Sequence, residues 1–243
     1  MAATNDDIGI LTHKKTQRAS EEVYSRLRSQ ILAGKFKPGD SLPSERSMMD
    51  SLKRSRPTIR EALRMLERAG LIKSFHGRDG AVVLSPGVDS IVQPLEDIIS
   101  MRKTSEAELL EVRELVEIAV AQWAALRYKD GDGENLLRTL IAVRDAVDSD
   151  SFFEADIRFH HALATATQNS LCEAMHSALF QLVFEILTTN FFRLTFQRQG
   201  ELRQEIIHDH QAIYDAVIAG DAEAAGERMR EHVRSFEALI NGK

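Results

Sequence analysis

The sequence predicts a mainly α-helical protein with two domains, and three observations support that prediction. Beyond residue 85, nearly every stretch repeats its apolar residues at a helical period. Apolar and polar residues nowhere alternate over a stretch long enough to build a large sheet. The 243 residues are enough for two ordinary domains, each with its own core.

The composition is that of a soluble globular protein, with 43% hydrophobic and 28% charged residues. No apolar stretch approaches the roughly 18 residues of a transmembrane helix, so no membrane partner is expected. A single cysteine, Cys172, excludes a disulfide framework and suits the cytoplasm. Residues 1–16 contain only a four-residue apolar run, which predicts a loose N-terminal arm and no signal peptide.

The net charge of −6 conceals an asymmetry between the two halves of the chain. Residues 1–85 contain 16 Lys+Arg against 10 Asp+Glu, which is +6, and the remaining 15 against 27 give −12. A basic front and an acidic back predict that only the front domain meets a polyanion. The Pro-Gly turn at Ser85–Gly87 sets the predicted boundary, with one domain at 17–85 and the other at 86–243.

The front domain is predicted to contain three short helices followed by a two-stranded hairpin. Pro38-Gly39 turns the chain after the first helix, and Ser44 is placed to cap the second. The third helix spans 56–69 and is closed by Gly70. The segments LIKSF and AVVL then form a wing, so the domain is predicted to be a winged helix-turn-helix.

The third helix is the predicted DNA-reading element. Its apolar residues face inward, whereas Arg56 and Arg60 point elsewhere, near the helix start that this motif inserts into the major groove. An arginine can donate two hydrogen bonds to guanine, worth about 1–3 kcal/mol of discrimination. Thr58 is a candidate contact to a thymine methyl or a phosphate. The alternative is that the basic residues only solvate a helix face, but their position at the helix start favours DNA reading.

These motifs resemble the DNA-binding domain of the GntR family of bacterial transcription regulators. The resemblance covers residues 20–84 and rests on LPSER, on R-x-x-x-R-E-A-L from Arg56 to Leu63, on L-x-x-x-GL and on the glycine-containing wing. It implies DNA contacts from seven residues: Arg46, Ser55, Arg56, Thr58, Arg60, His76 and Gly77. The family often has Gly-Val where this chain has Lys53-Arg54, so the turn before the third helix must form without glycine.

The back domain is predicted to be an all-α bundle. Helices are expected at about 105–127, 134–147, 151–168, 170–196, 202–219 and 222–240, with the segment KDGDGEN (129–135) as a break. In the first of these helices, the stripe expected to face inward consists of Leu109, Val112, Val116, Val120 and Trp123.

Ionisable residues on apolar stripes point to a metal site in this bundle. Asp156 and His160 share one stripe, and His210 and His232 each lie on a stripe of their own. The turn at Gly220-Asp221 brings His210 and His232 to the same level of an antiparallel helical hairpin. One Asp and three His converging inside a bundle predict a divalent metal site with positions left for water or a ligand.

Simpler explanations exist for each of these residues. A single histidine on an apolar face is more often a hydrogen-bonded core residue, and Asp156 with His160 can form an ordinary i,i+4 pair. Four inward positions on three helices favour the metal site. His161 and His208 lie off the stripes and are expected at the surface.

Residues from about 90 to 240 resemble the FCD ligand-sensing domain of the FadR subgroup of GntR regulators. The motifs are E-x-R-x-x-x-E from Glu111 to Glu117, D-x-x-F-H from Asp156 to His160, the following Asn169, H-x-x-I, the GD turn and M-x-x-H. The resemblance implies that Asp156, His160, His210 and His232 hold a divalent metal ion beside a carboxylate metabolite, with zinc preferred and nickel or manganese as alternatives. Arg113 is the candidate contact to the effector carboxylate, and its alternative role is a structural pair with Glu117.

The predicted function is that of a metabolite-responsive transcription regulator, a homodimeric repressor on a pseudo-palindromic DNA operator. The alternative is a metal-dependent enzyme acting on an organic acid and fused to a DNA-binding domain. The chain has no HExxH, no nucleophile motif and no glycine-rich phosphate loop, which favours the regulator. An architectural DNA-binding protein with a structural metal would have no need of an inward Arg113.

Overall fold

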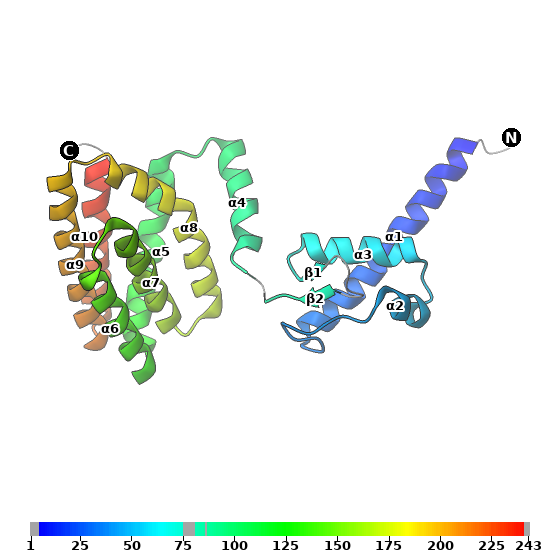
Figure 1. Ribbon diagram of the computed structural model, residues 1–243, viewed down its shortest axis with the longest axis horizontal. Coiled ribbons are helices and arrows are strands. Elements are labelled where there is room, and N and C mark those ends of the chain that lie inside the picture. The colour runs from blue at the N-terminus through cyan, green and yellow to red at the C-terminus, as the bar shows by residue number, and fades with distance from the viewer. Residues whose placement is uncertain (1–4, 75–80, 86, 241–243) are drawn as a thin grey trace. The chain divides into compact units, whose positions relative to one another are not determined.

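A computed structural model describes residues 5–74, 81–85 and 87–240. The chain divides into two compact units, Met1–Ser90 and Ile91–Lys243, and each is described by itself. Both units are built mainly from helices, as predicted, and the strands of the described residues form one two-stranded sheet (Figure 1).

The first unit contains α1 (Asn5–Leu32), α2 (Glu45–Leu52), α3 (Arg56–Arg68), β1 (Ile72–Ser74) and β2 (Ala81–Val83). The strands are antiparallel, with Ile72 opposite Val83. Helix α1 begins at Asn5, inside the segment expected to be a loose arm. No proline interrupts this helix.

The core of the first unit forms where α1 and α2 pack against α3. Its fully buried members include Ile59 and Leu66, which face inward as predicted. Gly70 ends the helix region with φ of +68°, and Lys53 closes α2 with φ of +52°. Lys53 therefore adopts the left-handed conformation that glycine favours, which is how the turn forms without a glycine.

The second unit consists of α4 (Asp89–Arg102), α5 (Glu106–Arg127), α6 (Asp130–Asp145), α7 (Ser149–Ala166), α8 (Ser170–Phe192), α9 (Phe196–Ile218) and α10 (Ala222–Ile240). Helix α4 was not predicted. Helix α10 packs along α5 and α9, and α6 packs along α7, so the described part of this unit is the expected all-α bundle (Figure 1).

Helix α6 begins at Asp130, so the break predicted over residues 129–135 is wrong. Asp132 Oδ2 accepts a hydrogen bond of 2.9 Å from the Lys129 backbone N–H, which caps the helix start. A Cβ added to Gly133 would lie 3.2 Å from Ile218 Cδ1, so this glycine allows the close approach of α6 to the end of α9. The glycine that suggested a break thus serves packing inside a helix.

The buried face of α5 matches the predicted stripe only in part. Val120 is fully buried as predicted, but Val112 is 48% exposed, and Ala121 and Ala124, outside the predicted stripe, are fully buried. Because these alanines are small, other helices can pack closely against α5. The buried face of α5 also includes Arg113.

Helix α8 is long and apolar enough by length and composition to be a candidate membrane span, with a mean hydropathy of 1.2. The expectation that no apolar stretch of the chain approaches the length of a transmembrane helix was therefore wrong. The helix packs against α5 and α7 and contributes Val183, Leu187 and Phe191 to the core of the bundle, while 28% of its apolar window is buried.

Candidate functional site

The predicted DNA-reading arginines lie at the start of α3 and are open to solvent. The side chains of Arg56 and Arg60 are 68% and 57% exposed. Both approach Glu45 of α2, with Arg56 Nε 3.1 Å from Oε2 and Arg60 Nε 3.7 Å from Oε1. Glu45 therefore holds both guanidinium groups on one face of the helix-turn-helix.

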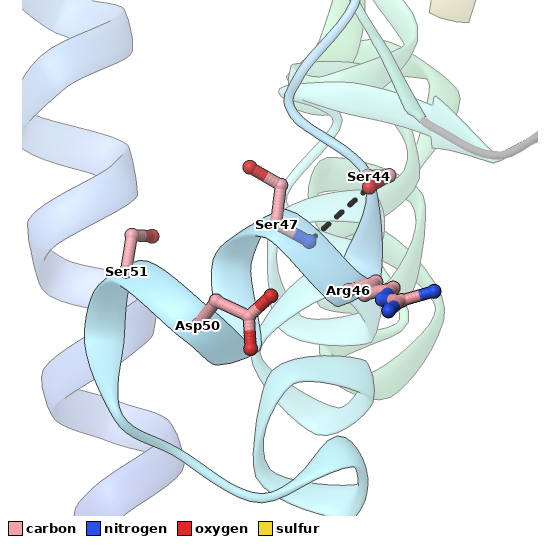
Figure 2. A pocket seen from close by; sticks show the side chains of 5 residues that line it. All are labelled: Ser44, Arg46, Ser47, Asp50 and Ser51. Carbon is pink, nitrogen blue, oxygen red and sulfur yellow. Dashed lines mark hydrogen bonds between the residues drawn. The ribbon is translucent and has the colours of Figure 1, made fainter.

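Arg46 projects from the first turn of α2 beside an open pocket of about 530 Å³ (Figure 2). The other lining residues are Ser44, Ser47, Asp50 and Ser51. Ser44 caps the helix as predicted, because its Oγ accepts the Ser47 backbone N–H at 3.2 Å. Arg46 is thus an exposed cation at the positive end of a helix, which suits a phosphate contact.

The other predicted DNA contacts are either less exposed than the arginines or lie outside the described residues. Thr58 is only 4% exposed, and its hydroxyl lies 2.9 Å from the hydroxyl of Ser55, so it has a partner within the protein. A DNA contact from Ser55 or Thr58 stays a prediction. His76 and Gly77 lie outside the described residues.

The four predicted metal ligands lie together inside the second unit. Asp156 and His160 come from α7, His210 from α9 and His232 from α10, and their exposed fractions are 9%, 0%, 0% and 3%. The ring centroids of His210 and His232 are 4.7 Å apart, and that of His160 lies 5.2 and 5.4 Å from them. The prediction that His210 and His232 lie at the same level of the helical hairpin is therefore confirmed.

The donor atoms of this cluster are close enough to share one ion. One nitrogen from each of the three imidazoles lies within 4.8 Å of the others. Asp156 Oδ1 is 3.4 Å from His210 Nε2 and 4.0 Å from His160 Nε2. The second distance is beyond a hydrogen bond, so a simple i,i+4 pair does not satisfy His160 Nε2.

Several ring nitrogens of this cluster are buried without a hydrogen-bond partner among the described residues. They are Nε2 of His160, both nitrogens of His210 and Nδ1 of His232, which lies 3.4 Å from Asp209 Oδ2. Burying such groups unpaired costs about 1–3 kcal/mol each. A divalent ion bound by three imidazoles and one carboxylate would take one nitrogen of each ring, and this donor set is one that zinc, nickel and manganese accept.

The local electrostatics keep two of these imidazoles neutral. Burial lowers the pKa of His210 well below its usual 6.5, and the neighbouring His232 and His160 add to the effect. Burial also lowers the pKa of His232. Burial acts on His160 as well, but the charge and hydrogen bond of Glu117 outweigh it and raise the pKa of His160. Neutral imidazole is the form that binds a metal.

Two further ionisable residues, Glu117 and His176, complete the buried cluster, and neither was predicted as a site residue. Glu117 Oε2 lies 3.1 Å from His160 Nδ1 and 3.3 Å from Nε2 of His176 on α8. Burial raises the pKa of Glu117, but His160 and His176 outweigh it and hold that pKa well below its usual 4.5. The signal for His176 was available, since it lies four residues after Cys172 and four before Phe180 on one stripe of α8.

Arg113 faces into the bundle, as predicted, and is 3% exposed. Its Nε lies 3.8 Å from Glu117 Oε1, so the structural pair considered from the sequence is present. Its Nε and Nη1 are nevertheless buried without a hydrogen-bond partner among the described residues. A buried guanidinium with free donors is suited to an anionic ligand.

The surface positions expected for His161 and His208 are confirmed. The His161 side chain is 52% exposed and its Nδ1 lies 3.2 Å from Ser177 Oγ, while His208 is exposed on α9. Adjacent histidines on α7 therefore have different surroundings, as the stripe pattern predicts.

Comparison with known proteins places both units in one family. Residues 19–83 match the family described as bacterial regulatory proteins, gntR family, and residues 108–235 match the FCD domain. The chain is 32% identical to the HTH-type transcriptional regulator LutR of Bacillus subtilis over 213 residues, which cover 87% of this chain and 96% of LutR. The chain belongs to the GntR family of bacterial transcription regulators.

This GntR regulator has further relatives of the same kind. It is 28% identical to the HTH-type transcriptional repressor NanR of Citrobacter rodentium, over 91% of this chain and 85% of NanR. The solved structure of Streptococcus agalactiae GntR shares the fold, with a TM-score of 0.68 and 24% identity over 89% of this chain and 98% of that one. The regulator is therefore a DNA-binding protein and not an enzyme, which removes the alternative considered from the sequence.

Proposed function

We propose that this GntR regulator is a cytoplasmic, homodimeric repressor that binds a pseudo-palindromic operator and responds to a small carboxylate bound beside a divalent metal. The observation that carries the proposal is the convergence of Asp156, His160, His210 and His232, buried and with unpaired ring nitrogens. A relative whose name calls it a repressor supports the direction of control. Two-fold symmetry of the protein would match two half-sites of DNA.

The four residues would hold the metal, with zinc preferred and nickel or manganese as alternatives. Three imidazoles and one carboxylate would fill four coordination positions of the metal. An ion with a coordination number of five or six would keep further positions for water or a ligand. A bound metal supplies a positive charge that attracts a carboxylate.

Arg113 would make a second contact to the effector carboxylate, in addition to the contact with the metal. It is buried near the metal ligands, with two donor nitrogens unpaired, and a carboxylate oxygen would accept a hydrogen bond from one of them. The effector changes DNA binding only if it prefers one arrangement of the protein over another, so binding of effector and of operator must be linked reciprocally.

Elemental analysis tests the metal. Protein purified without chelator should contain about one divalent ion per chain, as a site with this ligand count predicts. The variant His210→Ala should lose the ion, while His208→Ala, on the exposed side of the same helix, should keep it. Full metal content in His210→Ala would refute the assigned ligands.

A thermal-shift screen of mono- and dicarboxylates, sugar acids and aromatic acids tests the effector. Arg113→Ala should keep its metal and lose the stabilisation by the active acid, together with the effector's influence on operator binding. An unchanged response in this variant would place the effector elsewhere.

A further inference from the structure

The turn between α2 and α3 contains an exposed lysine in an unusual backbone conformation. Lys53 ends α2 with φ of +52° and ψ of +45°, and its side chain is exposed. A residue with a Cβ is disfavoured in this left-handed region, where glycine, or less often asparagine, is the usual residue. The shape of the turn therefore does not by itself account for a lysine at this position.

Lys53 also differs from most of its basic neighbours in having no partner within the protein. Five arginines of residues 45–68 approach carboxylates: Arg54 pairs with Glu22, Arg56 and Arg60 with Glu45, and Arg64 and Arg68 with Glu61. The two remaining basic residues of this segment, Arg46 and Lys53, have side chains with no ion pair or hydrogen bond among the described residues. Arg46 is already a predicted DNA contact, so Lys53 is the unpaired cation of the helix-turn-helix that still lacks a role.

The position of Lys53 relative to the predicted reading helix suggests that role. Ser55 is the N-cap of α3, so the Cα atoms of Lys53 and Ser55 are at most about 7 Å apart. A helix whose N-terminal end enters the major groove brings the residues just before it to the edge of the groove, where the phosphate backbone runs. Lysine carries a point charge on a flexible stem, which suits a phosphate better than a base edge.

We propose that Lys53 binds a DNA phosphate at the edge of the groove that α3 enters, and so adds affinity that does not depend on base sequence. The inference needs only the DNA binding that the family establishes. Neither the proposed metal nor the proposed effector enters it, and its failure would leave both untouched.

The salt dependence of DNA binding tests the proposal on the full chain. Wild type and Lys53→Gly are titrated with two duplexes, one selected from a random library by the wild-type protein and one of random sequence. Loss of one phosphate contact should lower the slope of log affinity against log salt concentration by about 0.9 for each bound chain. At about 0.1 M salt both duplexes should lose affinity by the same factor, about three- to tenfold, because a phosphate contact carries no sequence information.

Glycine is chosen because it adopts the left-handed conformation of the turn without strain. The thermal transition of Lys53→Gly should therefore be kept. If it is not, Lys53→Asn, which also tolerates this conformation, replaces it in the comparison. Lys53→Arg keeps the charge and should keep the wild-type slope.

Lys103 offers a matched control in the second unit. It follows the end of α4, is exposed, and also has a left-handed backbone, with φ of +54°. Lys103→Gly thus removes the same charge from the same conformation, and should leave the slope and both affinities unchanged.

Three outcomes would overturn the inference. An unchanged slope in Lys53→Gly would exclude the phosphate contact, and a lower stability of that variant would assign Lys53 to the negative end of the α2 dipole instead. A loss confined to the selected duplex would mean that Lys53 acts through the placement of α3. An equal loss in Lys103→Gly would show only the effect of net charge.

Discussion

His160 Nδ1 lies 3.1 Å from Glu117 Oε2, so a predicted metal ligand on α7 is oriented by a carboxylate on α5. With Nδ1 donating its proton to Glu117, His160 directs the lone pair of Nε2 toward Asp156 and His210. Carboxylates that hold the far nitrogen of a ligating histidine fix its tautomer and raise its basicity. The contact links the half of the cluster that would bind metal to the half that would bind the effector.

Replacement of Glu117 by glutamine should therefore weaken metal binding without changing the four ligands. The amide keeps the size of the side chain but removes the negative charge, and loss of such a partner typically costs 10- to 100-fold in affinity. Competition with a chelator measures the effect. Glu111→Gln, an exposed change on the same helix, should leave metal affinity unchanged, and equal affinity in Glu117→Gln would show that the carboxylate plays no part.

The stability of the metal-free protein should be greatest near pH 6.5. The pKa values of His210 and His232 are lowered in the folded state, so below about pH 6.5 the unfolded chain binds protons that the folded chain does not, and stability falls. The pKa of His160 is raised, so its contribution is present below about pH 6.5 and is lost as the pH rises through its folded value. Each proton changes the unfolding free energy by at most about 1.4 kcal/mol per pH unit.

Denaturant unfolding in the presence of a chelator, from pH 5 to 8.5, measures this dependence. His210→Gln should flatten the acid side of the profile, whereas His208→Gln, an exposed change on α9, should not. Stability that rises steadily toward pH 5 in the wild type would contradict the directions assigned to His210 and His232.

Arg56→Ala and Arg60→Ala should together abolish operator binding, and each alone should weaken it by about 5- to 150-fold, while leaving the fold intact. Both side chains are exposed at the start of α3, and each bidentate contact to guanine is worth about 1–3 kcal/mol. The probe is a duplex selected from a random library by the wild-type protein, and thermal unfolding checks the fold. Affinity that persists at moderate salt would refute the assignment of α3 as the reading helix.

Glu45→Gln should make the regulator less selective among DNA sequences. Glu45 attracts Arg56 and Arg60 and also repels phosphates, so its neutralisation should strengthen binding to non-operator DNA by about fivefold, or roughly 1 kcal/mol. The ratio of affinities for selected and random duplexes should fall.

The matched control for this change is Glu61→Gln. Glu61 pairs with Arg64 and Arg68, farther along α3 and away from the predicted contacts. Equal effects of the two substitutions on the affinity ratio would show a general charge effect and no specific role for Glu45.

Much of this protein could be predicted from residue patterns. The inward positions of Asp156, His160, His210 and His232 and the exposure of His161 follow from helical periodicity, because a helix buries one face and leaves the other in water. The start of α6 and part of the buried face of α5 were predicted wrongly. Both depend on how closely another helix approaches, as at Gly133 and Ala121, and periodicity within one helix does not contain that information.

The sequence by itself determined the family, the helical architecture and four of the clustered polar residues, since local period and motif spacing are properties of the chain. Only the tertiary structure decided that Glu117 joins Arg113, His160 and His176, residues contributed by three different helices. Contacts between helices depend on their rotation and separation in the bundle, and these are set by the packing of all the side chains together.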